Sequence, residues 1–245
     1  MQQGLRYRIL HGDAFALLRG MRASSVDAVI SDPPYSLRVH AGHRGGLRSR
    51  EKDRSDLGFD GLTPGQGAEL AEESARVAKG WVVLMCDHEL ARVYLETLEA
   101  MPDRVTFAPV ALMTLGGRVR MRGDGPASWL DYIIVSRPRG GVWGTWGALP
   151  GGYVAHGRDH GQLVGGKPRG FARRLIRDYT RPGDVVLDPF CAEGNFGMAT
   201  MDLGHRRYLG IESDLERATV ARRNLSKHRI FTGQRVMEGK QVDVF

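Results

Sequence analysis

The sequence has little cysteine and no long hydrophobic run. Among its 245 residues only two are cysteines, Cys86 and Cys191, and both lie in apolar, strand-like surroundings. They indicate buried thiols in a reducing cytosol, which argues against a disulfide framework and against a cysteine metal set. No apolar run is long enough to cross a bilayer, and the segment MQQGLRYRILHGD has no signal-peptide pattern. We therefore expect a cytoplasmic protein that binds no membrane.

Metal-ligand spacings are also missing. The eight histidines form no H-x-x-H or H-E-x-x-H pattern, and no Cys/His cluster exists. We therefore expect no metal cofactor. Nothing marks a nucleophile elbow either, although the sequence leaves a Ser–His–Asp arrangement open.

Lysine is scarce, so the positive charge comes from arginine. The formal net charge is +7, and only five lysines contribute to it. A basic balance suits a polyanionic partner such as nucleic acid. A genome that prefers arginine to lysine would give the same composition, so the distribution of the charge has to decide.

What the sequence does contain is an alternation of apolar, strand-length runs with amphipathic helical stretches. The expected strands are 7–10, 26–30, 81–86, 105–113, 132–136, 185–188 and 207–211. The expected helices are 13–20, 65–79, 87–100, 168–180 and 214–228. Continuous Val/Ile/Leu runs between helices predict an α/β fold, with a mostly parallel sheet covered on both faces. The length fits one large domain, or one domain with an insert.

Two segments interrupt this alternation. Residues 36–61 carry glycines and almost no apolar periodicity, and six Arg/Lys against two acids fall between 36 and 54. Residues 114–165 are rich in glycine and contain three of the four tryptophans. Both are expected to form loops and short hairpins.

Acidic residues follow four of the expected strands. They are Asp13, Asp32, Asp188 and Glu212. Ligands of open α/β sheets bind beyond the carboxyl ends of the strands, so four acids there are consistent with one shared site. Taken singly, Asp13 and Glu212 could be ordinary helix N-terminal acids, and Asp188 could be a turn former before Pro189.

Two motifs among these acids resemble those of the DNA amino-methyltransferases, which use S-adenosylmethionine. DPPY at 32–35 matches their catalytic motif, and DPFCAEGNFG at 188–197 resembles their cofactor motif, D-P-F-x-G-S-G-T-T. The run GGKPRGFARRLIRDYTRPGDVVLDPF resembles the Lys-Pro segment and helix before that motif, and GIES at 210–213 resembles the acid after the second strand. The catalytic motif precedes the cofactor motif, as in the β group of the family.

The resemblance implies a Rossmann-like, mostly parallel, seven-stranded sheet with circularly permuted motif order and an irregular insert. Residues 1–113 would form the catalytic half, including the basic loop 36–61. Residues 114–165 would form the target-recognition region, and 166–245 the cofactor-binding half of the same domain. The partner implied is double-stranded DNA. Relatives are often dimers, but the sequence leaves open both a homodimer and a partner restriction nuclease.

DPPY would act on an amine that is a poor nucleophile, because its lone pair is delocalised into an aromatic ring. The Asp32 carboxylate and the Pro33 carbonyl would accept hydrogen bonds from its two N–H groups and stabilise the positive charge that develops on nitrogen. Pro33 and Pro34 would keep this segment stiff and add no competing donors. Tyr35 would stack on a flipped-out base, with core packing as the alternative.

The resemblance also places the cofactor. Glu212 would bind its ribose hydroxyls, Asp13 would lie near its adenine amine, and Asp188 near its ammonium group. Lys167 would lie close by, against its carboxylate. The turn after Asp188 would pass along its methionine portion. The turn residues expected there are Phe190, Ala192, Gly194 and Asn195.

This turn departs from the family pattern at two positions. Ala192 stands where the first glycine is usual, and Glu193 adds an anion beside a site for a carboxylate. If position 192 needs a positive φ angle, alanine costs roughly 1 kcal/mol there. We expect a functional but weakened cofactor site, in which Asn195 still donates a hydrogen bond.

DNA would meet the two irregular segments. Phosphate contacts are expected from Arg44, Arg48, Arg50 and Arg54, unless that loop is simply solvated. Base contacts are expected from Arg118, Arg120 and Arg122, which lie in the expected recognition region.

The sequence as a whole predicts a DNA N6-adenine methyltransferase of the β group, which would produce S-adenosylhomocysteine. N4-cytosine methylation is the first alternative. RNA or protein methylation is the second, although such enzymes usually carry Asn-Pro-Pro-Tyr. A DNA-binding relative whose cofactor turn has decayed is the third.

Overall fold

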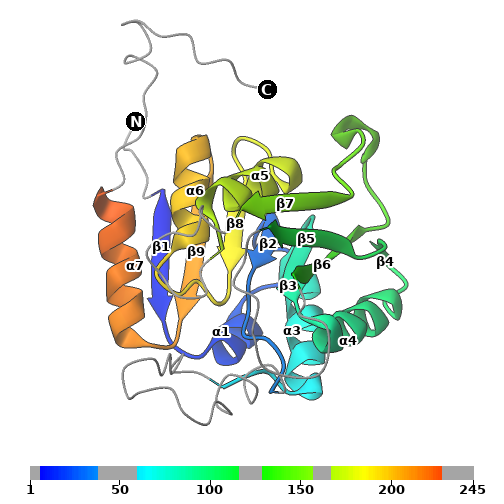
Figure 1. Ribbon diagram of the computed structural model, residues 1–245, viewed down its shortest axis with the longest axis horizontal. Helices are drawn as coiled ribbons and strands as arrows, with labels where there is room; N and C mark the ends of the chain where they lie inside the picture. The colour runs from blue at the N-terminus through cyan, green and yellow to red at the C-terminus, as the bar shows by residue number, and fades with distance from the viewer. Residues whose placement is uncertain (1–5, 38–59, 116–128, 157–166, 228–245) are drawn as a thin grey trace, which may run out of the picture.

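The computed structural model describes residues 6–37, 60–115, 129–156 and 167–227, which form one sheet between two layers of helices (Figure 1). The strands are β1 (Tyr7–His11), β2 (Ala28–Ser31), β3 (Val82–Cys86), β4 (Arg104–Thr106), β5 (Val110–Leu115), β6 (Leu130–Pro138), β7 (Gly152–His156), β8 (Val185–Asp188) and β9 (Arg207–Glu212). The helices are α1 (Ala14–Gly20), α3 (Pro64–Val77), α4 (His88–Glu99), α5 (Arg169–Tyr179), α6 (Asn195–Leu203) and α7 (Leu215–Lys227), with a 3-10 turn η1 (Gly144–Trp146). None of these helices is long and apolar enough to span a bilayer.

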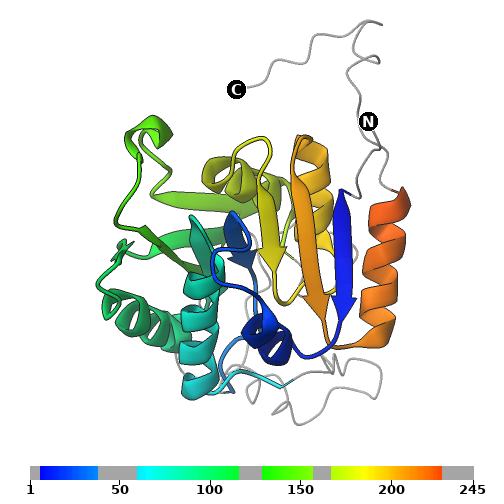
Figure 2. The ribbon, with the colours of Figure 1, turned by 180° about the vertical axis from the view of Figure 1, so that it is seen from behind.

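The sheet is mostly parallel. Its strand order is β1-β9-β8-β2-β3-β6-β5-β7, and β4 pairs with β6 beside β5. β6 runs antiparallel to β3, β4 and β5, whereas the other neighbouring pairs are parallel. Figure 2 shows β1, β8 and β9 running in the same direction. The predicted α/β fold is confirmed.

The sheet nevertheless has more strands than the seven that were predicted. The run 105–113 divides into β4 and β5, with Pro109, which has no N–H to donate to a ladder, between them. β7 lies inside the segment expected to be irregular. In it Tyr153 and Ala155 are buried while Val154 is 45% exposed, a period of two that the surrounding glycines concealed.

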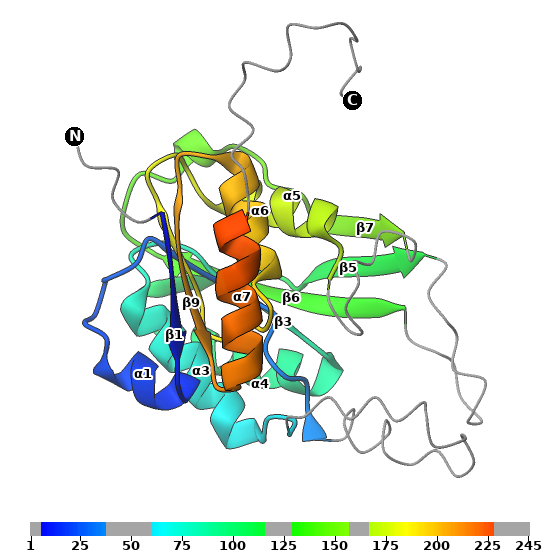
Figure 3. The same cartoon turned by 90° about the vertical axis from the view of Figure 1, so that its left-hand side faces the viewer.

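The sheet separates two hydrophobic cores, because successive strand residues point to opposite faces. Val29 packs into the core beneath α1, α3 and α4, and its neighbour Ile30 packs into the core beneath α5, α6 and α7. Figure 3 shows α1 and α7 on opposite sides of β1. Burial on both faces explains why the central strands read as unbroken apolar runs rather than alternating ones.

The chain reverses its direction of travel between β8 and β2. From β8 it continues outward to β9, whereas from β2 it continues to β3 on the other side. Such a point leaves a crevice beyond the carboxyl ends of the two strands, where ligands of α/β proteins bind. We call the edge at which β1, β2, β3, β8 and β9 end the carboxyl edge, and the opposite edge the amino edge. β6, being antiparallel, begins at the carboxyl edge.

Candidate active site

The four acids predicted from the strand ends do lie along one edge. Asp188 ends β8 and Glu212 ends β9, while Asp32 follows β2 directly and Asp13 follows β1 after one glycine. The parallel register of β1, β9, β8 and β2 places them in a row at the carboxyl edge. The sequence could indicate this row because the strands of a mostly parallel α/β sheet end at the same edge.

Asp188 is the buried centre of the row. Its carboxylate accepts hydrogen bonds from Ser31 Oγ at 2.6 Å and from Tyr208 OH at 2.9 Å, so it joins β2, β8 and β9. The backbone N–H of Phe190 donates to the same carboxylate at 3.2 Å. Burial raises the pKa of Asp188 to about 7, although these hydrogen bonds act against the rise. Asp188 therefore fixes the start of the turn that follows β8.

That turn contains two left-handed residues before α6 begins. Ala192 has φ 44° and Gly194 has φ 85°. Position 192 therefore does require the backbone conformation that favours glycine, and alanine there costs roughly 1 kcal/mol. The turn is held down by Cys191, whose N–H donates to the Ile211 carbonyl at 2.9 Å. It also lies close to β9, since a Cβ on Gly210 would come within 2.8 Å of Cys191 Sγ.

The predicted cofactor residues at either end of this turn have structural partners of their own. Asn195 Nδ2 donates to the Lys167 carbonyl at 2.6 Å, which joins the start of α6 to the segment before α5. Phe190 packs edge-on against Phe15 of α1, with ring centroids 6.0 Å apart. The two rings form an apolar wall between α1 and the turn.

Glu212 and Asp13 close the far end of the row. Glu212 is largely buried, and its Oε1 accepts the Asp214 N–H at 2.9 Å. Asp13 caps α1 by accepting the Ala16 N–H at 2.8 Å, so the structural role weighed for it in the sequence is present. Their contacts with a cofactor stay a prediction.

The DPPY segment is pinned beside β2 rather than free. The Ser36 N–H donates to Asp87 Oδ2 at 2.7 Å, and the Leu62 N–H donates to the Tyr35 carbonyl at 2.9 Å. Asp87 is in turn the N-cap of α4. Both prolines lack an N–H, so the segment adds no donor between Asp32 and Tyr35.

Within this segment Asp32 is the unusual group. Its Oδ1 is buried and accepts no hydrogen bond, which is rare for a carboxylate. Burial raises the pKa of Asp32 to about 6, opposed by the charge of Lys167 and reinforced by that of Asp131. A buried acceptor without a donor is what an incoming amine requires.

Lys167 reaches this acceptor from the segment before α5. Its Nζ lies 2.7 Å from Tyr35 OH, 2.9 Å from Asp131 Oδ2 and 3.6 Å from Asp32 Oδ1. It also lies 4.9 Å from the centroid of the Tyr35 ring. The two carboxylates raise the pKa of Lys167, although burial works against them, so the ammonium form is held. The sequence had placed this ammonium against the carboxylate of the cofactor, which stays a prediction.

Asp131 was missed by the sequence analysis. It lies at the start of β6, next to the end of β3, because Tyr132 pairs with Cys86. The available signal was an acid just before the apolar run 132–136, but a run of this kind does not reveal that its strand is antiparallel. Only the reversed direction brings the start of that strand to the carboxyl edge.

All the arginines predicted to contact DNA lie outside the residues that the structure describes. They are Arg44, Arg48, Arg50, Arg54, Arg118, Arg120 and Arg122. The described residues that flank both segments are at the carboxyl edge. Ser36 bridges Leu62 there, and the end of β5 lies beside the start of β6.

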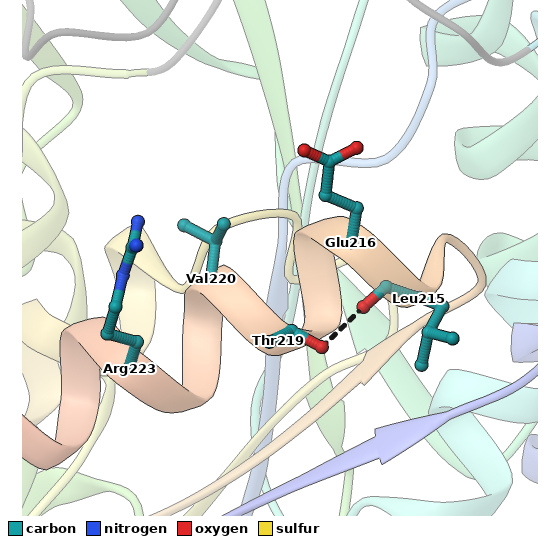
Figure 4. Close-up of a pocket in the computed structure, with 5 residues that line it drawn as sticks. All are labelled: Leu215, Glu216, Thr219, Val220 and Arg223. Atoms are coloured by element: carbon teal, nitrogen blue, oxygen red, sulfur yellow. Dashed lines mark hydrogen bonds between the residues drawn. The ribbon is translucent and has the colours of Figure 1, made fainter.

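A hollow on the surface of α7 is lined by none of the four acids. It measures about 470 Å³ and is lined by one face of α7, from Leu215 to Arg223 (Figure 4). Thr219 Oγ donates to the Leu215 carbonyl within that helix. In the described part of the chain, no group of three or more His, Cys, Asp or Glu could hold a metal ion.

Comparison with known sequences points to one family. The family N6_N4_Mtase, described as DNA methylase, matches residues 146–223, which include Lys167, the turn after β8 and Glu212. The type II methyltransferase M2.DpnII of Streptococcus pneumoniae is 39% identical over 59 residues, which are 24% of this chain and 22% of that protein. The DNA adenine methyltransferase YhdJ of Escherichia coli K12 is 24% identical over 274 residues, covering 95% of this chain and 87% of that protein.

Solved structures agree in fold along the chain. M1.HpyAVI in its complex with SAM superposes with a TM-score of 0.60 at 20% identity, covering 89% of this chain and 100% of that one. The PvuII DNA methyltransferase, cytosine-N4-specific, superposes with a TM-score of 0.63 at 14% identity, covering 89% of this chain and 85% of that one. With the motifs at the carboxyl edge, the sequence matches confirm the resemblance predicted from the sequence: the chain is similar to the S-adenosylmethionine-dependent DNA amino-methyltransferases.

Proposed function

We propose that the protein is a DNA methyltransferase that moves a methyl group from S-adenosylmethionine to the N6 amine of an adenine turned out of the double helix. One observation carries the proposal: Asp32 Oδ1 is a buried acceptor without a donor, at the point of the sheet where a ligand binds. Enzymes that modify a base amine take the base out of the stack, so a recessed acceptor suits them.

The residues of the carboxyl edge fit the cofactor. The Glu212 carboxylate suits ribose hydroxyls, since hydroxyls donate and an ionised carboxylate accepts. The Phe15–Phe190 wall suits an apolar ring, and the turn carries small residues at its two left-handed positions, Ala192 and Gly194. When bound there, S-adenosylmethionine supplies a methyl group on a positively charged sulfur.

Asp32 and Pro33 perform the activation in this proposal. Their carboxylate and carbonyl oxygens accept hydrogen bonds from the two N–H groups of the amine and turn its lone pair toward the methyl group. As the C–N bond forms and the C–S bond breaks, nitrogen gains positive charge. One of its protons passes to the Asp32 carboxylate and then to water. The C–S bonding pair stays with the thioether product, S-adenosylhomocysteine.

Tyr35 and Lys167 shape the pocket for the base. The Tyr35 ring is proposed to stack on the base, and its hydroxyl is fixed by the Lys167 ammonium at 2.7 Å. Holding the base in line with the methyl group contributes to the rate, because no orientational freedom is then lost during the reaction.

Double-stranded DNA is proposed to lie across the carboxyl edge. The flanks of 38–59 and 116–128 are at that edge, so their arginines would face the DNA backbone and bases. We propose 1–113 as the catalytic half, 114–165 as the target-recognition region and 166–245 as the cofactor-binding half.

Adenine is favoured over cytosine by the match to the adenine methyltransferase YhdJ along most of both chains. The likeness to the cytosine-N4-specific PvuII enzyme keeps N4-cytosine as the second candidate. The two reactions use the same acceptor geometry, so the structure around Asp32 serves either amine.

The test is incubation with radiolabelled S-adenosylmethionine and unmethylated genomic DNA, followed by nucleoside analysis. The expected product is N6-methyladenine, and Asp32→Ala serves as the inactive control. Label in N4-methylcytosine would move the proposal to cytosine. Absence of label together with absence of cofactor binding in calorimetry would replace it with a DNA-binding relative, which the strained Ala192 and the acid Glu193 would then explain.

A further inference from the structure

Asp131 has a partner whose position matters to the proposed reaction. The Lys167 ammonium lies 2.9 Å from Asp131 Oδ2 and 3.6 Å from Asp32 Oδ1. The first distance is a hydrogen bond and the second is not. The lysine side chain is only 13% exposed, so its ammonium has few acceptors other than these carboxylates and Tyr35 OH.

Strand pairing of β6 fixes the backbone position of Asp131. Asp131 lies within β6, between β3 and β5, and pairs with Leu112. Tyr35, which shares the ammonium, is held through its carbonyl by Leu62. Both anchors of Lys167 are therefore rigid, and they draw the ammonium away from Asp32.

We propose that Asp131 is a positioning residue that holds the Lys167 ammonium off Asp32, so that Asp32 Oδ1 stays open to the amine of the target base. This rests on the proposed function and extends it by one residue. Without the Asp131 charge, the ammonium would close on Asp32 and occupy the oxygen that the amine needs.

The net charge of the pocket also supports a role for Asp131 in the reaction. Two carboxylates and one ammonium leave a net negative charge where the amine nitrogen becomes positive, which stabilises the transition state. Neutralising Asp131 removes this net negative charge. The loss would appear in kcat rather than in the affinity for the cofactor.

The pH dependence follows from the groups that face Asp32. Lys167 and Tyr35 favour its ionised form, whereas Asp131 disfavours it. The further neighbours are Asp188 at the end of β8, Cys86 at the end of β3 and Tyr94 on α4. Removing the Asp131 charge lowers the pKa of Asp32, and closer approach of Lys167 lowers it further. The acid limb of the activity profile therefore moves to lower pH while the plateau falls.

The experiment compares wild type, Asp131→Asn, Lys167→Met and the double variant by kcat and KM across pH. It also titrates the Asp32 carboxyl carbon in the free protein by NMR. Asp178→Asn is the matched control, since Asp178 is a buried acid that bonds Tyr153 OH at 2.9 Å and is next to Tyr179 of the amino edge. Asp131→Glu tests rescue by the retained charge.

Asp131→Asn is expected to lower kcat about tenfold or more and to lower the pKa of Asp32 by about one unit. With Lys167 removed, the same substitution should lower kcat and the pKa of Asp32 by clearly less, because no ammonium is left to close on Asp32 and only the direct effect of the Asp131 charge remains. Asp131→Glu should recover most of kcat, and Asp178→Asn should match wild type in both readouts.

Equal effects of Asp131→Asn with and without Lys167 would overturn the proposal, as would an unchanged acid limb. If Lys167→Met transfers no methyl group, the comparison is made on the NMR titration alone, where equal shifts overturn it as well. If wild type transfers no methyl group to DNA, the proposed function fails. The titration then still decides whether Asp131 holds Lys167 away from Asp32.

Discussion

The two edges of the sheet differ in how they use polar and aromatic side chains. At the carboxyl edge, the Oδ1 atom of Asp32 is buried without a hydrogen-bond donor, and Asp32 shares Lys167 with Asp131. At the amino edge, Trp81 packs against Trp143, Trp146 and Tyr179, with ring centroids 5.3 to 5.5 Å apart. One edge presents a carboxylate oxygen without a donor, and at the other edge aromatic rings pack against one another.

At the amino edge, positively charged side chains contact aromatic rings or pair with Asp27. Arg181 lies 3.7 Å from the centroid of the Trp146 ring, and Arg137 lies 5.0 Å from that of Trp143. Asp27 is paired on both oxygens, with Lys79 Nζ at 2.9 Å and the Val185 N–H at 2.8 Å. The comparison shows that the two acids flanking β2 differ: Asp27 before the strand is paired on both oxygens, whereas Asp32 after it has an oxygen without a donor.

The largest expected effect concerns the amino edge. Trp81→Ala should lower the free energy of unfolding by about 3–5 kcal/mol, because it empties the centre of the aromatic cluster. Denaturant unfolding measures this. Methyl transfer per folded molecule should stay at the wild-type level well below the melting temperature, and a large fall in kcat would break the separation of the two edges.

The next effect is a rise in the free energy of unfolding, and it concerns the carboxyl edge. The pKa of Asp32 in the folded protein is raised to about 6 from 3.8, so the native state binds this proton more tightly than the unfolded chain. Stability from this group is therefore highest below the unfolded pKa and falls as the pH rises through the folded one. Asp32→Asn should raise the free energy of unfolding by about 2–3 kcal/mol near pH 8.

The matched control for that substitution is at the amino edge. Asp27→Asn should destabilise the protein by about 1 kcal/mol, since it weakens an ion pair and a backbone hydrogen bond. Denaturant midpoints at two pH values would separate the variants. If Asp32→Asn also destabilised at high pH, its carboxylate would have to be well compensated, contrary to the account.

The pH profile of methyl transfer should have an acid limb near the pKa of Asp32, about 6. The ionised carboxylate is the form that accepts from the amine, so activity should fall about tenfold for each pH unit below it. The pH profile of kcat/KM, which reports the free protein, would test this. A limb near the ordinary value of 3.8 would contradict the raised pKa of Asp32.

The smallest expected effect is at the turn after β8. Ala192→Gly should stabilise the protein by about 1 kcal/mol, because glycine adopts a φ of 44° without the clash of a Cβ. It should also tighten S-adenosylmethionine binding severalfold in calorimetry if strain in the turn weakens that site. Unchanged stability would indicate that the surrounding structure has already absorbed the strain.

Much of this arrangement could be predicted from the residues. The unbroken apolar runs gave the buried strands, and the acids after them gave the row from Asp13 to Asp32. The glycine that a related turn carries at position 192 raised the question of a positive φ there, and the structure has one. These features depend on local chemistry that is visible in a short stretch of chain.

Features that depend on direction or on distant packing could not be predicted. Asp131 reaches the carboxyl edge only because β6 is antiparallel, and an apolar run reads the same in both directions. Trp143 and Trp146 were included in the target-recognition segment, yet they pack on Trp81 at the amino edge. Their glycine-rich surroundings indicated a loop but not the edge to which it belongs.

The measurement that tests the account most directly is single-turnover methyl transfer to a duplex with one target adenine, comparing wild type with Asp32→Asn after loading with cofactor. The account predicts the same bound S-adenosylmethionine in both proteins and a rate at least about a hundredfold lower in the variant, because the amine loses its charged acceptor. Transfer at the wild-type rate by Asp32→Asn would contradict it.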